Sequence, residues 1–185
     1  MTELFEEIEA PPASYPPEPS GLGSVPEVQT GVPMPLSADV IWPRIEAWID
    51  QRWTSRSVTW IVEGPGDFDP PLSPINSAST DLWNGSAWES VTLDASFMGG
   101  WSLPGDGPYR IIADVGGGTV PEVVNQAYRR LHDYLACTPG RPTYTQRSLS
   151  LDIMSENWSK PEVMLARAMQ NSGAGDLLRV YRRTK

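Results

Sequence analysis

Apolar side chains recur at helical spacing between residues 42 and 55. The members of this face lie three or four positions apart and are Ile45, Trp48, Ile49 and Trp53. We expect the helix to begin at Trp42, because Pro43 then lies in the first turn, where its missing N–H costs no hydrogen bond. A start at Ser37 would instead place Pro43 in the helix interior, at a cost of about 3 kcal/mol.

Two further helices are predicted over residues 121–137 and 160–170. Each has a proline in its first turn, Pro121 in one and Pro161 in the other. The apolar face of the helix over 121–137 consists of Val124, Ala127, Tyr128, Leu131, Tyr134 and Leu135.

Short β-branched and aromatic segments in the middle of the chain predict a small antiparallel sheet. Asn84 and Gly85 lie between segments that carry Trp83 and Trp88, and this pair predicts a hairpin with a type I′ turn. Both central residues of such a turn need a positive φ, which Asn and Gly tolerate best. The predicted strands span residues 57–63, 77–83, 86–93, 101–103, 109–115 and 144–152.

The N-terminal part is acidic and rich in proline. Eight prolines lie between residues 11 and 35, and residues 1–40 contain seven acidic side chains and no Lys or Arg. Prolines at this density exclude a helix or a central strand, so we expect an extended, polyproline-like arm. Such an arm is disordered in solution or lies on a partner surface. Leu4, Phe5 and Ile8 predict one short amphipathic turn on that partner.

Together these elements predict an α+β fold. It is a small helical bundle with an inserted antiparallel β-sheet and hairpin region and an extended proline-rich N-terminal arm. The predicted parts are an acidic arm at 1–36, a folded domain at 37–172 with its β insertion at 57–115, and a hinge with a C-terminal segment at 173–185.

Charge and cysteine content exclude several classes of function. The chain of 185 residues has 14 Lys and Arg against 23 Asp and Glu, a net charge of −9, which argues against a nucleic-acid or anionic-membrane binder. One Cys excludes an intrachain disulfide and a cysteine zinc site, and one His excludes metal sites that need two. No apolar run suits a membrane span, and no basic region suits a signal peptide. We expect a soluble protein of a reducing compartment without a cofactor.

Individual residues offer weak catalytic hypotheses. Gly116–Gly118 between a strand and a helix resembles a phosphate cradle, but no P-loop lysine follows, and a flexible corner is the better interpretation. His132 has no second ligand or nucleophile beside it, and Cys137 lies at the apolar end of the same helix. We interpret the first as a packed or surface residue and the second as a buried inert thiol.

A small hydrolase such as a glycosidase would need two carboxylates that face each other across its cleft. The pairs available are Asp67 with Asp69 and Glu89 with Asp94. Their neighbourhoods are proline loops and a hairpin edge, where carboxylates are usually turn residues or part of a solvated face. We therefore expect no enzyme.

The tryptophans of the predicted sheet are a second indication of function. A Trp-rich antiparallel sheet can stack sugar rings, as carbohydrate-binding modules do, and a carbohydrate- or receptor-binding β module stays the alternative. We favour aromatic side chains of a core or a subunit interface, where Trp is enriched. The residues concerned are Trp60, Trp83, Trp88 and Trp101.

The C-terminal segment alternates basic and apolar side chains after a hinge at Gly173–Gly175. Residues 127–185 carry ten basic side chains against five acidic ones, although the whole chain is acidic. This pattern suits docking into an acidic-rimmed groove on a protein better than a solvated tail or a DNA contact. The side chains are Leu177, Leu178, Arg179, Val180, Tyr181, Arg182, Arg183 and Lys185.

The order of the motifs over residues 40–185 resembles the head-tail connector (adaptor) proteins of long-tailed bacteriophages and related gene transfer agents. In that family a strand that ends in Gly leads into a V-P-x5-A helix, and a small-residue hinge precedes L-L-x-x-Y-R. Here Val180 stands where Pro is usual, and the N-terminal arm replaces an extra helix. The segments are WPRIEAWIDQRWTSR (42–56), GPGDFDPPL (64–72), WNGSAW (83–88), GPYRIIADVGGG (107–118), VPEVVNQAYRRLHDYLA (120–136) and SGAGDLLRVYRR (172–183).

The resemblance implies a structural virion protein of the neck, assembled in the bacterial host cytoplasm, with no catalysis and no membrane contact. It implies a ring of twelve subunits between the portal protein and a stopper (head-closure) or tail terminator protein. Double-stranded DNA would pass through the ring without specific binding. In this family the closing segment reaches the portal, which assigns portal binding to Asp176, Leu177, Leu178, Arg179, Val180, Tyr181, Arg182 and Arg183.

Overall fold

The computed structural model describes residues 2–22, 36–97, 99–136, 146–151, 154–159 and 167–182. The chain divides into two compact units. We call the first the β unit, which consists of Met1–Pro16 and Asp50–Thr119, and the second the helical unit, which consists of Pro17–Ile49 and Val120–Lys185. The chain therefore passes from the β unit to the helical unit, back again, and once more to the helical unit.

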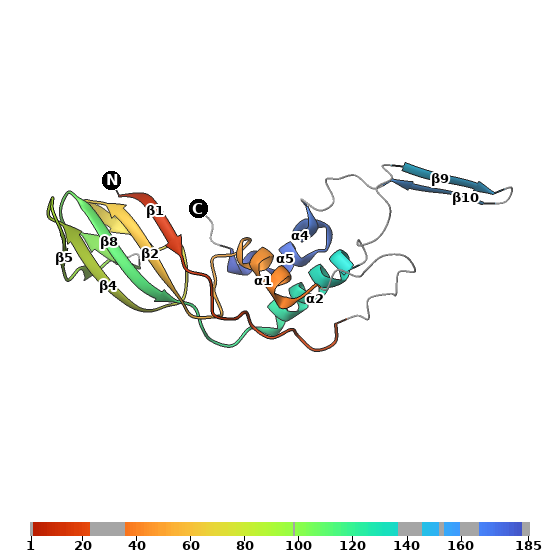
Figure 1. Cartoon of the computed structure of the whole chain (residues 1–185), viewed down its shortest axis with the longest axis horizontal. Helices are drawn as coiled ribbons and strands as arrows, with labels where there is room; N and C mark the ends of the chain where they lie inside the picture. Colours follow the sequence, from red (N-terminus) through yellow and green to blue (C-terminus); the bar gives the residue numbers. More distant parts are fainter. Residues whose placement is uncertain are drawn as a thin grey trace. The chain divides into compact units, whose positions relative to one another are not determined.

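The β unit contains an antiparallel five-stranded sheet and a smaller three-stranded sheet (Figure 1). The strands of the larger sheet, in spatial order, are β1 (Glu3–Glu9), β2 (Arg56–Glu63), β8 (Pro108–Val115), β4 (Ile75–Trp83) and β5 (Trp88–Ser90). Those of the smaller sheet are β3 (Gly66–Phe68), β7 (Trp101–Leu103) and β6 (Asp94–Ala95).

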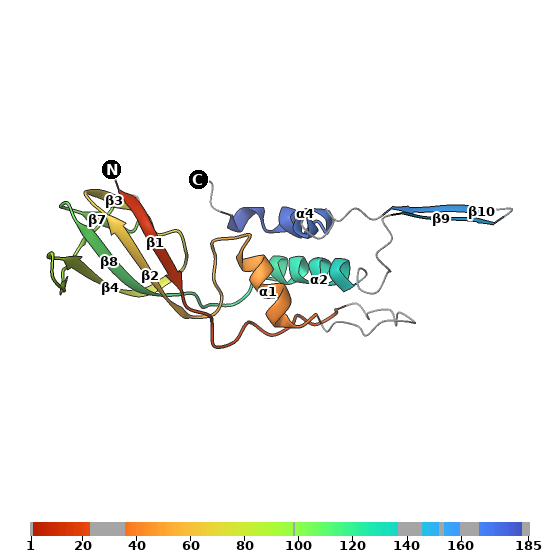
Figure 2. The same cartoon turned by 45° about the horizontal axis from the view of Figure 1, so that its top comes forward.

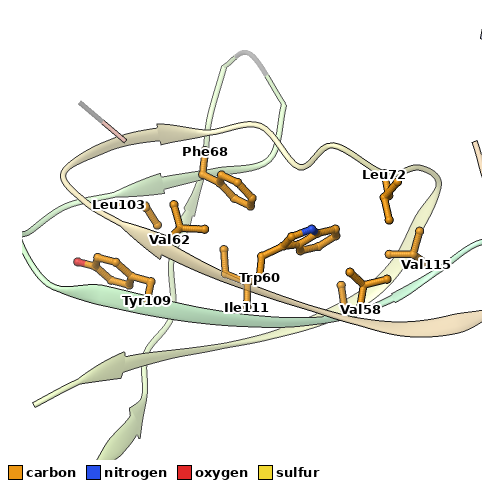
Figure 3. Packing of buried hydrophobic residues seen from close by; sticks show 10 residues of the cluster. Val58, Trp60, Val62, Phe68, Leu72, Leu103, Tyr109, Ile111 and Val115 are labelled. Atoms are coloured by element: carbon orange, nitrogen blue, oxygen red, sulfur yellow. The ribbon is translucent and has the colours of Figure 1, made fainter. Parts of the chain in front are cut away.

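Strict alternation in β2 and β8 builds the core of the β unit. Every second residue of each strand is buried, so one face of the sheet is apolar. Phe68 and Leu72 face Trp60 from the other side of this core, and the Phe68 and Trp60 rings lie 6.0 Å apart (Figure 3). The buried core residues are Val58, Trp60, Val62, Phe68, Leu72, Leu103, Tyr109, Ile111, Ala113 and Val115.

The helical unit packs short helices around α2 (Figure 2). The Trp42 ring of α1 lies 5.2 Å from the Tyr128 ring of α2. The helices are α1 (Ala38–Glu46), α2 (Glu122–Ala136), α4 (Ala168–Asn171), α5 (Ala174–Leu177) and the 3₁₀ helix η1 (Arg179–Tyr181). The unit also contains an antiparallel pair, β9 (Gln146–Leu151) and β10 (Met154–Ser159).

The predicted α+β fold class was wrong. The described residues form a mostly β protein, with antiparallel sheets and few, mostly short helices, instead of a helical bundle with an inserted hairpin. The prediction overlooked β1, β3, β6 and β10, which lack the β-branched pattern of β2. These segments are strands because a neighbouring strand supplies backbone partners, which local sequence does not reveal.

The N-terminal ten residues do not form an amphipathic turn on a partner. Glu3–Glu9 is β1, the edge strand of the larger sheet, in antiparallel register with β2. The first helix also differs from the predicted 42–55, because α1 spans Ala38–Glu46 with Ser37 at its N-cap and Pro43 in its interior. The complete burial of Ile41, Trp42 and Ile45 offsets the backbone hydrogen bond that Pro43 cannot make.

The predicted type I′ hairpin turn was also wrong. Trp83 and Trp88 are directly opposed, so a four-residue loop joins β4 to β5. Positive φ occurs only at glycines among the described residues, and Gly85 has it but Asn84 does not. Asn84 is instead a side-chain cap, because its Oδ1 accepts hydrogen bonds from the backbone N–H groups of Ser86 and Ala87, each at 2.9 Å.

The other predicted elements meet the structure as follows. The helix predicted over 121–137 corresponds to α2, and five of the six residues of its apolar face are buried. Most of the helix predicted over 160–170 lies outside the described residues. Within the described residues, α4 begins at Ala168. The strand predicted over 144–152 corresponds to β9, and its ends also lie outside them.

Candidate partner-binding surfaces

The C-terminal segment is anchored in the helical unit. Leu178 and Ala174 are completely buried. A Cβ atom at Gly175 would lie 3.2 Å from the carbonyl oxygen of Met169 and 3.3 Å from the Trp48 ring, so the backbone approaches its neighbours closely there. The predicted hinge at 173–175 is thus a packed helix start in this structure.

The same anchoring directs other residues of the segment outward. Val180 is 89 % exposed, and Arg179 and Arg182 on either side of it are exposed too. The Arg182 guanidinium lies over the Trp48 ring, 4.9 Å from its centroid, which holds its position. An apolar side chain between two cations is therefore presented on a fixed backbone.

The eight residues predicted to bind the portal do not share one environment. Asp176 is exposed, Leu177 and Tyr181 are half-buried, and Leu178 is a core residue of its own unit. Arg183 lies outside the described residues. The structure thus separates an anchor, Leu178, from an exposed group defined by Arg179, Val180 and Arg182.

Two of the five tryptophans of the β unit lie together on the outer face of the larger sheet, the face opposite the core. The rings of Trp83 and Trp88 are 5.3 Å apart and inclined by 59°. Arg110 lies over Trp88 at 4.7 Å. Its Nε and Nη2 donate hydrogen bonds to Asp81 at 3.0 and 2.7 Å.

This aromatic cluster makes a poor flat platform for a sugar ring. The tilt packs one indole against the other, and the guanidinium covers part of Trp88, which leaves Trp83, 37 % exposed, as the accessible ring. Trp60 is a core residue, and Trp101 is half-buried against Phe68 with ring centroids 6.5 Å apart. The arrangement suits a rigid protein-contact surface better than sugar stacking.

Two of the residues considered for catalysis, Gly116 and His132, belong to different units of the chain. Gly116 has φ +107°, and a Cβ there would lie 2.3 Å from the Thr54 carbonyl oxygen, so close packing accounts for this glycine. His132 is buried in α2, with Nδ1 3.2 Å from the Asp133 carboxylate, and Cys137 lies outside the described residues. In the part of the chain that the structure describes, no three His, Cys, Asp or Glu side chains gather as metal ligands.

Of the predicted carboxylate pairs, Asp67 lies on β3 with Asp69 directly after that strand, both exposed, and the other pair is divided between the two sheets. Glu89 belongs to the larger sheet and Asp94 to the smaller one. The smaller sheet instead places Asp67 and Asp94 on either side of Ser102, one strand apart from it in each direction. Both carboxylates are exposed, which is the setting of solvated surface groups.

Small side chains leave a hollow of about 350 Å³ over β2, β4 and β8. Its carboxylate, Asp114, accepts hydrogen bonds from Ser55 and from Asn76. The carboxylate of this hollow is thus already hydrogen-bonded to neighbouring side chains. Its lining residues are Ser57, Ser77, Ala78, Ser79, Ile112, Ala113 and Asp114.

A charged cluster attaches β1 to the rest of the β unit. Glu9 accepts hydrogen bonds from Arg52 Nε at 2.7 Å and Nη2 at 3.1 Å, and from Arg56 Nη1 at 2.9 Å. The side chains of Arg52 and Arg56 are only 8 % and 3 % exposed. Burial by itself raises the pKa of the Glu9 carboxyl, but the two guanidinium groups together outweigh it and lower that pKa below its ordinary value.

Sequence reasoning missed this cluster because Glu9 and the two arginines are more than 40 positions apart. The pattern that could have indicated it is the pair of arginines that precedes a strongly apolar strand.

No protein-family model and no curated protein matches this chain. In the described residues, no helix is long and apolar enough to cross a bilayer.

Proposed function

We propose that this chain is a structural virion protein, a head-tail connector that forms a ring between the portal and the stopper or tail terminator protein. The proposal begins from the resemblance of its motifs to connectors. Three motif-bearing segments, far apart in sequence, pack into one helical unit. Trp42 contacts Tyr128, and Arg182 lies over Trp48.

The observation that carries the proposal is the anchored C-terminal segment. Leu178 fixes it, and Val180 is 89 % exposed between two exposed arginines. An apolar group flanked by guanidinium groups suits a portal groove lined by carboxylates or carbonyl oxygens. The segment is held in place beforehand, so binding costs little conformational entropy.

The charge distribution supports a ring through which DNA passes. The chain has a net charge of −9, while its C-terminal third is basic. Opposite charges on different parts of a subunit favour ordered stacking between copies and partners. Acidic walls repel DNA phosphates and keep the duplex from adhering. The proposed location is the neck of a phage or gene-transfer particle, with twelve copies assembled in the bacterial cytoplasm.

The first test is the copy number of this protein in purified particles, measured by quantitative mass spectrometry against the portal. A one-to-one ratio with about twelve copies of each is expected for a ring stacked on the portal. Absence from particles, or hundreds of copies, would contradict the proposal.

A surface variant then tests the C-terminal segment. Val180→Asp is expected to weaken attachment to the portal at least tenfold in a pull-down, because it places a carboxylate in the apolar contact. Val123→Asp, at a 38 % exposed site of the same unit, is the matched control and should bind normally. Both variants should keep the thermal midpoint of the parent. If Val180→Asp binds the portal as tightly as the parent does, the assignment of Val180 to the portal contact is wrong.

A carbohydrate- or receptor-binding β module is the second candidate. The observation that favours it is the exposed Trp83 beside Trp88 and Arg110 on a sheet-rich unit. If this candidate is right, the protein should bind to a glycan array, and Trp83→Ala should abolish that binding. A connector is expected not to bind glycans, so one array experiment distinguishes the two functions.

A further inference from the structure

Strand β1 is a long open edge of the larger sheet. It is the first strand in the order β1-β2-β8-β4-β5, and in the part of the chain that the structure describes no strand pairs with its other side (Figure 1). The opposite edge is formed by β5, which has only three residues. Sheets usually keep exposed edges short, charged or covered, because an open edge can pair with another chain. With seven residues, β1 is long enough to receive a partner strand.

The backbone groups of Glu7 and Glu9 point to this open side. Ala10, directly after the strand, donates its N–H to the Ser57 carbonyl oxygen at 2.9 Å. Hydrogen bonds to one neighbour alternate along an antiparallel strand, so Ile8 bonds to β2 and the residues on either side of it face away. Glu7 and Glu9 therefore each present one N–H and one C=O group along the edge.

Three apolar side chains are exposed along β1. Leu4, Phe5 and Ile8 are 41 %, 58 % and 53 % exposed, a concentration of apolar surface on one short strand. An edge that only repels other chains is built from charged residues and does not need exposed Phe or Ile. The β-bulge lies between Leu4 and Glu6 and leaves Glu6–Glu9 in regular register with β2. The second half of β1 can therefore extend the sheet by a further strand.

The charge of β1 determines which strand fits. Glu3, Glu6 and Glu7 are exposed, and residues 1–40 contain no Lys or Arg. Like charges directly opposite each other on two strands destabilise the pair, whereas opposite charges stabilise it. The edge therefore rejects a second copy of β1 and accepts a cationic strand with apolar residues.

A second copy of this chain is a poor source of that strand. Each strand of the described residues contains at most one Lys or Arg, against the three exposed glutamates of β1. Arg56 and Arg110, the arginines of β2 and β8, already bond to carboxylates of their own sheet. A different protein is therefore the better source of a strand with several cationic side chains.

We propose that the open edge of β1 is a docking site for an extended segment of a different protein. This segment adds a strand to the larger sheet, with basic side chains opposite the glutamates of β1 and apolar side chains opposite its exposed apolar residues. Backbone hydrogen bonds at Glu7 and Glu9 provide affinity, and the side-chain pattern provides specificity. The site belongs to the β unit, whereas the segment proposed to bind the portal belongs to the helical unit. The inference thus stands or fails separately from the proposed function.

A synthetic peptide tests the docking site. The probe is KIKKFLK, the reverse of the β1 sequence with Lys in place of each Glu, so that antiparallel pairing places opposite charges across from each other. Fluorescence anisotropy of the labelled peptide with the full-length protein is expected to show saturable binding below about 1 mM. In the complex, amide hydrogen exchange measured by NMR should slow about fivefold or more at Glu7 and Glu9, because the added strand bonds to them. Exchange at Ile8, which already bonds to β2, should change little.

Matched controls separate strand addition from the attraction of charges alone. The same peptide with every backbone amide N-methylated keeps its side chains but cannot donate to the edge, so it should bind about tenfold more weakly or worse. Glu6→Lys should weaken binding of the unmodified peptide about fivefold. Glu89→Lys, at an exposed site on β5 at the opposite edge, makes the same change in net charge and should bind within about twofold of the parent.

Several results would overturn the inference. These are no saturable binding below about 1 mM, equal binding of the N-methylated peptide, and equal losses in the two Lys variants. Binding without slower exchange at Glu7 and Glu9 would overturn it too, because charges would then attract the peptide without an added strand. Self-association of the parent protein that Glu6→Lys abolishes, measured by sedimentation, would identify a second copy as the occupant and contradict the choice of a different protein.

Discussion

At the residue scale, the clearest feature is a carboxylate that holds two buried arginines. Glu9 bonds to both Arg52 and Arg56, and the Arg56 guanidinium also lies 5.9 Å from the centre of the Tyr15 ring. These groups connect the first residues of the chain to the start of β2. Their contribution depends on the charge of Glu9, so it depends on pH.

The first prediction concerns acid stability. The folded-state pKa of Glu9 is lowered, so its contribution is complete above the ordinary glutamate value of 4.5 and is lost as the pH falls through the lowered pKa. Glu9→Gln is expected to lower the free energy of unfolding by about 2 kcal/mol at pH 7. Its unfolding free energy should also depend less on pH below 4.5, in urea titrations from pH 3 to 7. Equal pH dependence of variant and parent would contradict the role of this cluster.

At the element scale, α1 shows how burial overrides helix preference. Pro43 in its interior cannot donate to the carbonyl of Asp39, and the helix forms nevertheless because three large side chains become fully buried. The loop between β4 and β5 also differs from what its local sequence predicts. Asn84 was expected to supply positive φ and supplies a side-chain acceptor instead.

The second prediction concerns Pro43. Pro43→Ala restores the missing backbone donor and should raise the free energy of unfolding by about 1–2 kcal/mol, after allowance for the greater freedom of the unfolded chain. The measurement is chemical unfolding followed by far-ultraviolet circular dichroism. Arg44→Ala, at the exposed neighbouring position, is the control and should change the value by less than about 0.5 kcal/mol. Destabilisation by Pro43→Ala would mean that ring packing outweighs the backbone bond.

At the scale of the whole molecule, the chain forms two units with separate cores. The core of the β unit is the cluster around Trp60, and the helical unit buries Leu178 and Leu131. This division matters for the design of a C-terminal deletion as a test of portal binding. Removal of residues 176–185 takes away a core side chain, so a loss of portal binding after that deletion would not identify a binding surface.

The third prediction follows from the separate cores. Leu178→Ala is expected to cost about 3 kcal/mol and to speed amide hydrogen exchange in α2, with little change in β2 and β8. Ile111→Ala, at an equally buried site of the β unit, should speed amide hydrogen exchange in β2 and β8 and change it little in α2. Exchange that increases equally in both units for both variants would show that they unfold together.

Local sequence predicted the strands and helices that satisfy their own periodicity. β2 and β8 alternate strictly, and α2 has an apolar stripe, so each could be placed to within one residue of the structure at either end. The exposed arginines and valine of the C-terminal segment were also recognised as a group of candidates, since alternation of basic and apolar residues is visible in the sequence.

Only the tertiary structure decided the rest. Glu3–Glu9 is a strand because β2 provides its backbone partners and Arg52 and Arg56 receive Glu9, and both lie more than 40 residues away. Leu178 is a buried anchor and Val180 is an exposed side chain because α5 packs on α2, although both are apolar residues of the same short segment. Periodicity records which side of an element is apolar. Which neighbour covers that side is set by contacts between distant segments, and these contacts turned a predicted helical bundle into a mostly β protein.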